Sequence, residues 1–247
     1  MRSCGPIADN YSMARRILPI LLFCIVLAAG AQEHDPGYYP EALRGEVWVE
    51  LEPMYGDRPD AEYPVSPETA AKRALRAAAS FYSGMIYGWS FRYDIGEKAR
   101  GITEDFGVLE PLGEIPWGDP ALNITEVETR GSTLRVWTDY QLSEVQQKRT
   151  NLWRMGTVRN AQGIGYCPLQ GPSPDSGWLE VQNAALQDAA RAAVRAMLRG
   201  SERNRPKEAV GIICLASFPR IFIAHGQWVA IARFRVQVNE IIPFAAY

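Results

Sequence analysis

Hydrophobic and polar residues alternate along several stretches of the chain. In residues 46–54, Val47, Val49 and Leu51 fall on one face, a period of two that predicts a strand. The other face carries Trp48, Glu50 and Glu52. Residues 87–94 alternate in the same way, with aromatic residues on one face. Further strands are predicted at 122–128, 133–142, 157–167, 210–217, 220–224 and 228–238.

Two alanine-rich segments have the longer period of a helix. Ser66-Pro67-Glu68 is a typical helix start, with Ser66 as N-cap and Pro67 at the first helical position, and the helix is expected to run to about Ser83. A second helix is predicted at 178–198. Its apolar stripe is opposite a polar stripe that contains Arg191, Arg195 and Arg199.

Both halves of the chain have the same order of predicted elements. Each half has an opening strand, a loop, an alanine-rich helix and an antiparallel pair that ends in a long strand. We therefore predict an α+β fold of two similar two-layer units, 45–145 and 155–242, each an Ala-rich helix packed on a mainly antiparallel sheet.

Residues 1–31 have the pattern of a cleavable signal peptide. Arg15 and Arg16 precede an apolar run, and small residues lead to a cleavage site after Ala31. Translation from Met1 or from Met13 fits this pattern. The apolar run is shorter than the ~20 residues that span a membrane, so we expect an exported, periplasmic protein with no transmembrane segment in the mature chain. Phe23 precedes Cys24, where a lipidation signal needs a small residue, so no lipid anchor is expected.

Charge and composition exclude several kinds of partner. The whole chain has a net charge of −2, and without residues 1–31 it has 23 basic and 27 acidic residues, a net charge of −4. This charge argues against nucleic acid as a partner, because phosphate binding needs a surplus of basic residues. The chain has two histidines, too few for a Cys/His metal site. Gly163-x-Gly165 is not followed directly by a helix, so it is interpreted as a bend rather than a nucleotide site. We expect no cofactor.

Cys167 and Cys214 are the cysteines that remain after the predicted cleavage. In an oxidising compartment they are candidates for a disulfide. The alternative is a pair of buried free thiols, which the apolar run around Cys214 favours equally.

The second half resembles a known family. Residues 160–166, a Pro-rich loop and the helix at 184–193 resemble the small exported domain of flagellar assembly protein T and related outer-membrane lipoproteins, and residues 70–78 resemble it more loosely. The resemblance implies a role in envelope or flagellar-ring assembly, without catalysis. The lipidated cysteine of that family is missing here.

These observations lead to three hypotheses about function. The first is a non-enzymatic envelope or flagellum-associated assembly protein, with Arg191, Arg195 and Arg199 either docking envelope or flagellar proteins or forming a solvated helix face. The second is a periplasmic binding module that holds a small or peptidic ligand against aromatic residues, which otherwise belong to the core. Its candidate residues are Tyr87, Trp89 and Trp117. The third is an exported hydrolase, for which carboxylate pairs such as Glu126 and Glu128 are the candidates.

Overall fold

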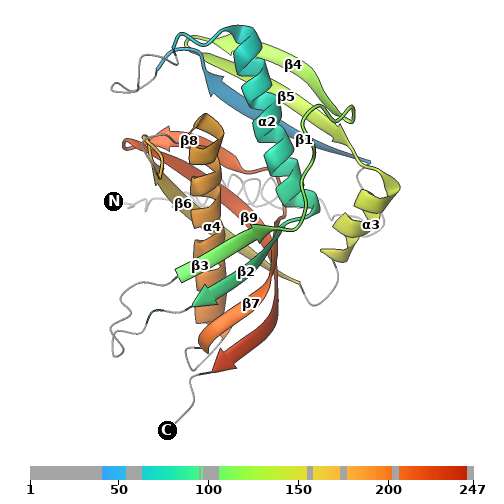
Figure 1. Ribbon diagram of the computed structural model, residues 1–247, viewed down its shortest axis with the longest axis vertical. Helices are drawn as coiled ribbons and strands as arrows, with labels where there is room; N and C mark the ends of the chain where they lie inside the picture. Colours follow the sequence, from blue (N-terminus) through green and yellow to red (C-terminus); the bar gives the residue numbers. More distant parts are fainter. Residues whose placement is uncertain are drawn as a thin grey trace, which may run out of the picture. The chain divides into compact units, whose positions relative to one another are not determined.

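The computed structural model describes residues 41–53, 63–94, 96, 106–154, 158–172, 177–201 and 206–243. Within these residues there are three helices and two antiparallel sheets (Figure 1). The predicted signal peptide, 1–31, lies outside the described residues. The predicted α+β class is confirmed, and each of two Ala-rich helices packs on an antiparallel sheet.

The smaller sheet has three strands. They are, in spatial order, β1 (Ala42–Glu50), β5 (Thr133–Gln141) and β4 (Leu122–Arg130). The predicted hairpin of β4 and β5 is present, and Gly131 in its turn has φ +58°. Glycine takes such a positive φ without the steric cost that a side chain would add.

The larger sheet has six strands. Five follow the spatial order β3 (Phe106–Pro111), β2 (Trp89–Asp94), β7 (Pro206–Leu215), β9 (Gln227–Pro243) and β6 (Arg159–Pro168), and β8 (Arg220–Ala224) pairs with β9. Strand β3 lies in a stretch for which the sequence pattern predicts no strand.

Strand pairing crosses the boundary between the two predicted units. Strand β2 comes from the unit predicted at 45–145, yet it pairs with β7 from the unit predicted at 155–242, with Trp89 opposite Ile213. The described residues all belong to one compact unit. The two alanine-rich helices therefore lie over different sheets, but the halves of the chain share the larger sheet.

Helix α2 (Pro67–Ile86) begins as its sequence predicts. The Ser66 hydroxyl accepts a hydrogen bond from the Thr69 amide, and Pro67 is the first residue of the helix. Small buried residues such as Ala70, Ala74 and Ala77 line the packed face. The helix continues past Gly84, where the missing side chain leaves room for the ring of Trp89.

Helix α4 (Trp178–Ser201) lies on strands β6 and β9. Gly163 and Gly165 of β6 face it, and a Cβ at either glycine would overlap the backbone of Ala189. The interpretation of these glycines as a bend before a loop is therefore wrong, since they lie within a strand and permit close approach of a helix.

Helix α3 (Glu144–Leu152) was not predicted from the periodicity. It buries no residue of its own, so its sequence has no apolar stripe. A capping box begins it, in which Ser143 and Gln146 each bond the backbone of the other.

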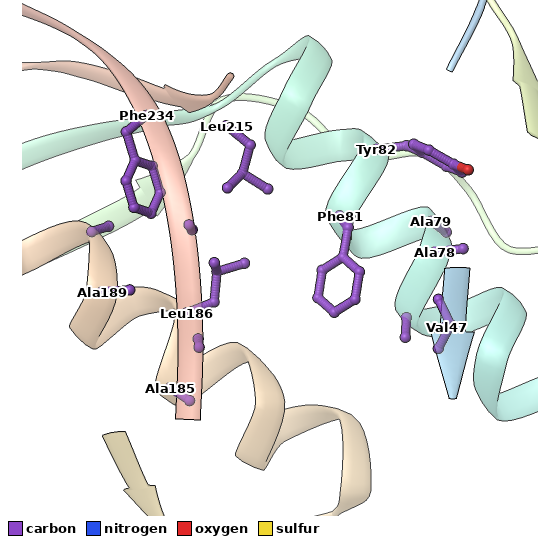
Figure 2. Packing of buried hydrophobic residues seen from close by; sticks show 14 of the residues in the cluster. Val47, Ala78, Ala79, Phe81, Tyr82, Ala185, Leu186, Ala189, Leu215 and Phe234 are labelled. Carbon is purple, nitrogen blue, oxygen red and sulfur yellow. The ribbon is translucent and has the colours of Figure 1, made fainter. Parts of the chain in front are cut away.

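The core is continuous between the two sheets. Figure 2 shows side chains of α2, α4 and their strands in one cluster, including Phe81, Leu186 and Phe234. Phe218, which follows β7, packs its ring against Phe81 and Tyr82 of α2 and covers Gly45 of β1. On β1, the ring of Trp48 stacks on Trp228 of β9.

Candidate ligand-binding groove

A groove runs between α2 and α4. It consists of two adjoining cavities of about 810 Å³ and 580 Å³, each within the usual size range of ligand pockets. The two cavities share Arg76 of α2 and Leu179, Asn183 and Gln187 of α4. Because these residues line both, the cavities form one elongated site.

Residues spaced by about one helical turn form the two walls. On α2, Arg73, Arg76 and Ser80 lie at positions i, i+3 and i+7, which share one face of a helix. On α4, Asn183, Gln187 and Arg191 follow at intervals of four. The walls meet where the Ser80 hydroxyl donates a hydrogen bond of 3.0 Å to Asn183 Oδ1.

The segment after β3 lines the smaller cavity of the groove. The Ile115 amide donates to Ser83 Oγ over 2.8 Å, and the side chain of Ile115 is buried. This anchor places Trp117 beside the groove, with its side chain 54% exposed. The Arg76 guanidinium lies over the Trp117 ring, 5.0 Å from its centroid, a distance typical of a cation–π contact.

The structure brings two of the three predicted ligand-binding aromatics together. Trp89 and Trp117 both line the smaller cavity. Tyr87 is not among its lining residues and instead contacts α3, where Gln146 Nε2 donates to its hydroxyl and Arg149 lies over its ring. The other aromatics of β2, Phe91 and Tyr93, are buried in the core.

The three predicted partner-binding arginines have three different environments. Arg191 lines the larger cavity, and its Nε donates to the Gly107 carbonyl over 3.1 Å. Arg195 Nε donates to the Tyr93 hydroxyl over 3.0 Å. Arg199 is exposed near the end of α4. The first two thus tie α4 to strands β3 and β2, and the stripe is not a uniform surface.

Comparison with known proteins identifies a family for this chain. A family model matches residues 35–244, which covers the groove and both sheets. The chain belongs to this family. A relative in Treponema pallidum (strain Nichols), described as an uncharacterized protein, is 28% identical over 204 residues, which is 81% of each chain. No solved structure matches the chain.

Cys167 and Cys214 lie on different strands of the larger sheet, β6 and β7, with β9 between them. Both are buried free thiols. They lie opposite Trp228 and Arg235 of β9, roughly 20 Å apart along that strand at the usual rise per residue. A disulfide needs Cα atoms within about 7 Å, so the candidate bridge does not form, and of the two alternatives the structure has the buried free thiols. Burial raises the pKa of Cys214 to about 12 and also raises that of Cys167.

The candidate hydrolase carboxylates do not face an enclosed site. On the edge strand β4, Glu126 is exposed, and Glu128 is half-buried and pairs with Arg130 over 2.8 Å. In the described part of the chain, no cluster of three His, Cys, Asp or Glu residues could hold a metal ion. No helix among those residues is long and apolar enough to span a membrane.

Sequence reasoning missed most of the groove's polar residues. Arg73, Arg76, Ser80, Asn183 and Gln187 were not singled out. The available signal was the helical spacing of polar residues beside the alanine faces. That spacing places them at the border of each buried face, but it does not show that the two borders meet.

Proposed function

We propose that this protein is an exported binding module that holds a small or peptidic ligand in the groove between α2 and α4. The observation that carries the proposal is the combination of a large concave site with Trp89 and Trp117 beside polar groups from both helices. Binding sites commonly combine apolar walls with a few convergent polar groups.

The contacts around the groove are suited to holding a ligand without chemistry. Ser83 fixes the segment that presents Trp117, and the Ser80–Asn183 bond fixes the distance between the walls. Such fixed walls reduce the entropy cost of binding.

Native mass spectrometry of the protein purified gently from its own cells tests the binding function. We expect an additional mass on the protein that is lost on denaturation. Replacement of Ser80 by Trp fills the groove and should abolish it, whereas Ile164→Trp, on the exposed face of β6, should retain it. Retention of the mass by Ser80→Trp would place the ligand elsewhere.

Export is part of the same proposal. The basic and apolar pattern of residues 13–31 supports it. Cell fractionation followed by N-terminal sequencing of the mature protein tests it. The expected N-terminus is Gln32, and an intact N-terminus on cytoplasmic protein would contradict export.

Envelope or flagellar assembly is the second candidate function. Besides the resemblance of residues 160–166 and 184–193, it is favoured by the edge strand β6, whose outer face exposes Ile164 and Tyr166 by 43% and 53%. Exposed apolar side chains on a strand edge are typical of docking surfaces. Ile164→Arg should then prevent cross-linking to ring or outer-membrane components, while Gln162→Arg on the same strand should not. Equal cross-linking by both variants would contradict this candidate.

A further inference from the structure

The charge of the groove is opposite in sign to that of the chain. The whole sequence has a net charge of −2. The described residues that line the larger cavity nevertheless include three arginines, Arg73, Arg76 and Arg191, and one acidic residue, Glu180. The smaller cavity adds the acidic residue Glu114, so the arginines are still in excess in the groove. A concave site of one sign concentrates ligands of the other, so this cavity favours an anion.

Two of these arginines keep donors available to a ligand. Among the described residues, neither Arg76 nor Arg191 has a carboxylate partner. Arg76 rests on the Trp117 ring, and Arg191 uses its Nε for the Gly107 carbonyl. The terminal nitrogens of both can therefore donate to a carboxylate, which is the acceptor that a guanidinium matches best.

The middle of the groove adds neutral donors. Asn183 Oδ1 accepts from Ser80, which leaves the N–H groups of the Asn183 amide for another acceptor. Gln187 follows one turn later and lines both cavities. Side-chain amides in a row can bond the carbonyl and N–H groups of an extended peptide backbone.

The smaller cavity is suited to an apolar group. Trp89, Ile115, Leu179 and Leu186 line it, together with the exposed face of Trp117. Since the two cavities share four residues, a ligand that spans both would meet Arg191 in the larger cavity, Arg76 where the cavities adjoin, and Trp89 and Trp117 in the smaller cavity.

We propose that the groove binds acidic peptide segments. Peptide carboxylates bind at Arg76 and Arg191, the peptide backbone bonds Asn183 and Gln187, and an apolar side chain packs against Trp89 and Trp117. This inference rests on the proposed binding function and names its ligand class. A small inorganic anion would use the arginines but would leave the amides and the tryptophan end unused.

Three synthetic peptides of equal length test this inference on the full chain. They carry one leucine each and are otherwise rich in Glu, in Gln or in Lys. Tryptophan fluorescence and calorimetry measure their affinity. We expect the Glu peptide to bind, and we expect Arg76→Gln and Arg191→Gln each to weaken its binding about tenfold, as loss of a charge-assisted hydrogen bond does.

Arg199→Gln is the matched control, because it removes the same charge from α4 at an exposed position outside the groove. It should leave affinity within about twofold, since a distant exposed charge is largely screened by salt. Unfolding midpoints of all variants verify that the fold is retained.

Each other outcome separates the ligand class from the binding function. Equal affinity for the Glu and Gln peptides would overturn the acidic class and leave the binding function standing. Binding of inorganic phosphate at the arginines, with no peptide binding, would overturn the peptide class alone. If no peptide binds and the purified protein also carries no additional mass, both proposals fail.

Discussion

At the scale of residues, small side chains decide where elements approach one another. Gly163 and Gly165 have no Cβ at the place where the backbone of α4 crosses β6, which lets the helix approach the strand. In the same way, the missing Cβ of Gly45 leaves room for the ring of Phe218. Interiors are packed closely enough that one added methyl group must displace a neighbour.

Gly163→Ala should lower the free energy of unfolding by at least about 2 kcal/mol, because its Cβ would overlap the Ala189 carbonyl and force α4 away from the strand. Urea denaturation followed by circular dichroism measures this. Gln162→Ala, exposed on the same strand, should change stability by less than about 0.5 kcal/mol. Similar midpoints for the two variants would show that α4 does not lie so close.

Alkaline pH should destabilise the protein through two buried groups. Burial raises the pKa of Cys214 from 9.0 to about 12 and that of Tyr82 from 10.0 to about 12. Below pH 9 both are protonated in the folded and unfolded states, so the full stability is present there. As pH rises towards 12, the unfolded state releases these protons first and stability falls.

Thermal unfolding between pH 7 and 11 measures this dependence, and Cys214→Ala should make the decline above pH 9 shallower. The difference in thiolate absorbance between the unmodified protein and Cys214→Ala provides an independent check, because Cys167 and the tyrosines contribute equally to both. A Cys214 thiolate signal in the folded protein at pH 9 would contradict the buried position.

The glycine and alanine patterns of β6 and α4 are visible in the sequence, but the contact between them is not. Gly163-x-Gly165 is visible as a motif, and Ala185, Ala189 and Ala193 are visible as a stripe. That they face each other follows from the pairing of α4 with β6, which depends on residues well apart along the chain. The separation of Cys167 and Cys214 depends in the same way on β9, which lies between their strands.

At the scale of elements, the sequence predicted the helices and strands whose signals lie within the element itself. Ser66 and Pro67 predict the start of α2, and alternation predicts β5 and most of β9, which extends past the predicted end at 238 to Pro243. Helix α3 was missed because it buries no side chain and its evidence is the short capping box at Ser143. Its contact with Tyr87 is what removes that aromatic residue from the groove.

The segment between β7 and β8 packs Phe218, from the larger sheet's side, against α2 and β1. The variant Phe218→Ala tests how much this packing contributes to stability. Loss of the ring removes its contacts with Phe81, Tyr82 and Gly45. We expect a loss of about 2 to 3 kcal/mol, near the lower end for a core phenylalanine because this ring is only half-buried. Urea unfolding followed by tryptophan fluorescence measures it.

Phe218→Leu is the matched control, since it keeps an apolar side chain at the same place and should cost less than about 1.5 kcal/mol. Equal losses for the two variants would mean that the aromatic contacts add nothing to stability.

At the scale of the whole molecule, the halves depend on each other. Strand β2 has β3 on one side and β7 on the other, so the larger sheet needs residues from both halves. Alternation along 87–94 shows that a strand is present but not which strand it pairs with, and the apparent repeat of elements favoured two separate sheets. The groove was beyond sequence reasoning for the same reason, because it needs the relative placement of α2 and α4.

Dividing the chain after residue 154 tests this dependence. We expect neither fragment alone to unfold cooperatively, because the first loses β7 and exposes Phe91 and Tyr93, and the second loses the strand that pairs with Ile213. Mixing the fragments should restore native near-ultraviolet circular dichroism. Cooperative unfolding of each isolated fragment would establish two independent domains instead.

The pairing of β2 with β7 also has a consequence for the time course of folding. Trp89 and Ile213 are neighbours in the sheet although about half of the sequence separates them. Contacts between residues far apart in sequence slow folding, because the entropy cost of closing a long loop comes before the contacts can stabilise the structure. During synthesis, β2 therefore waits for its central neighbour until the last part of the chain has left the ribosome. Until then the larger sheet stays incomplete, and Trp89 has no neighbour from β7.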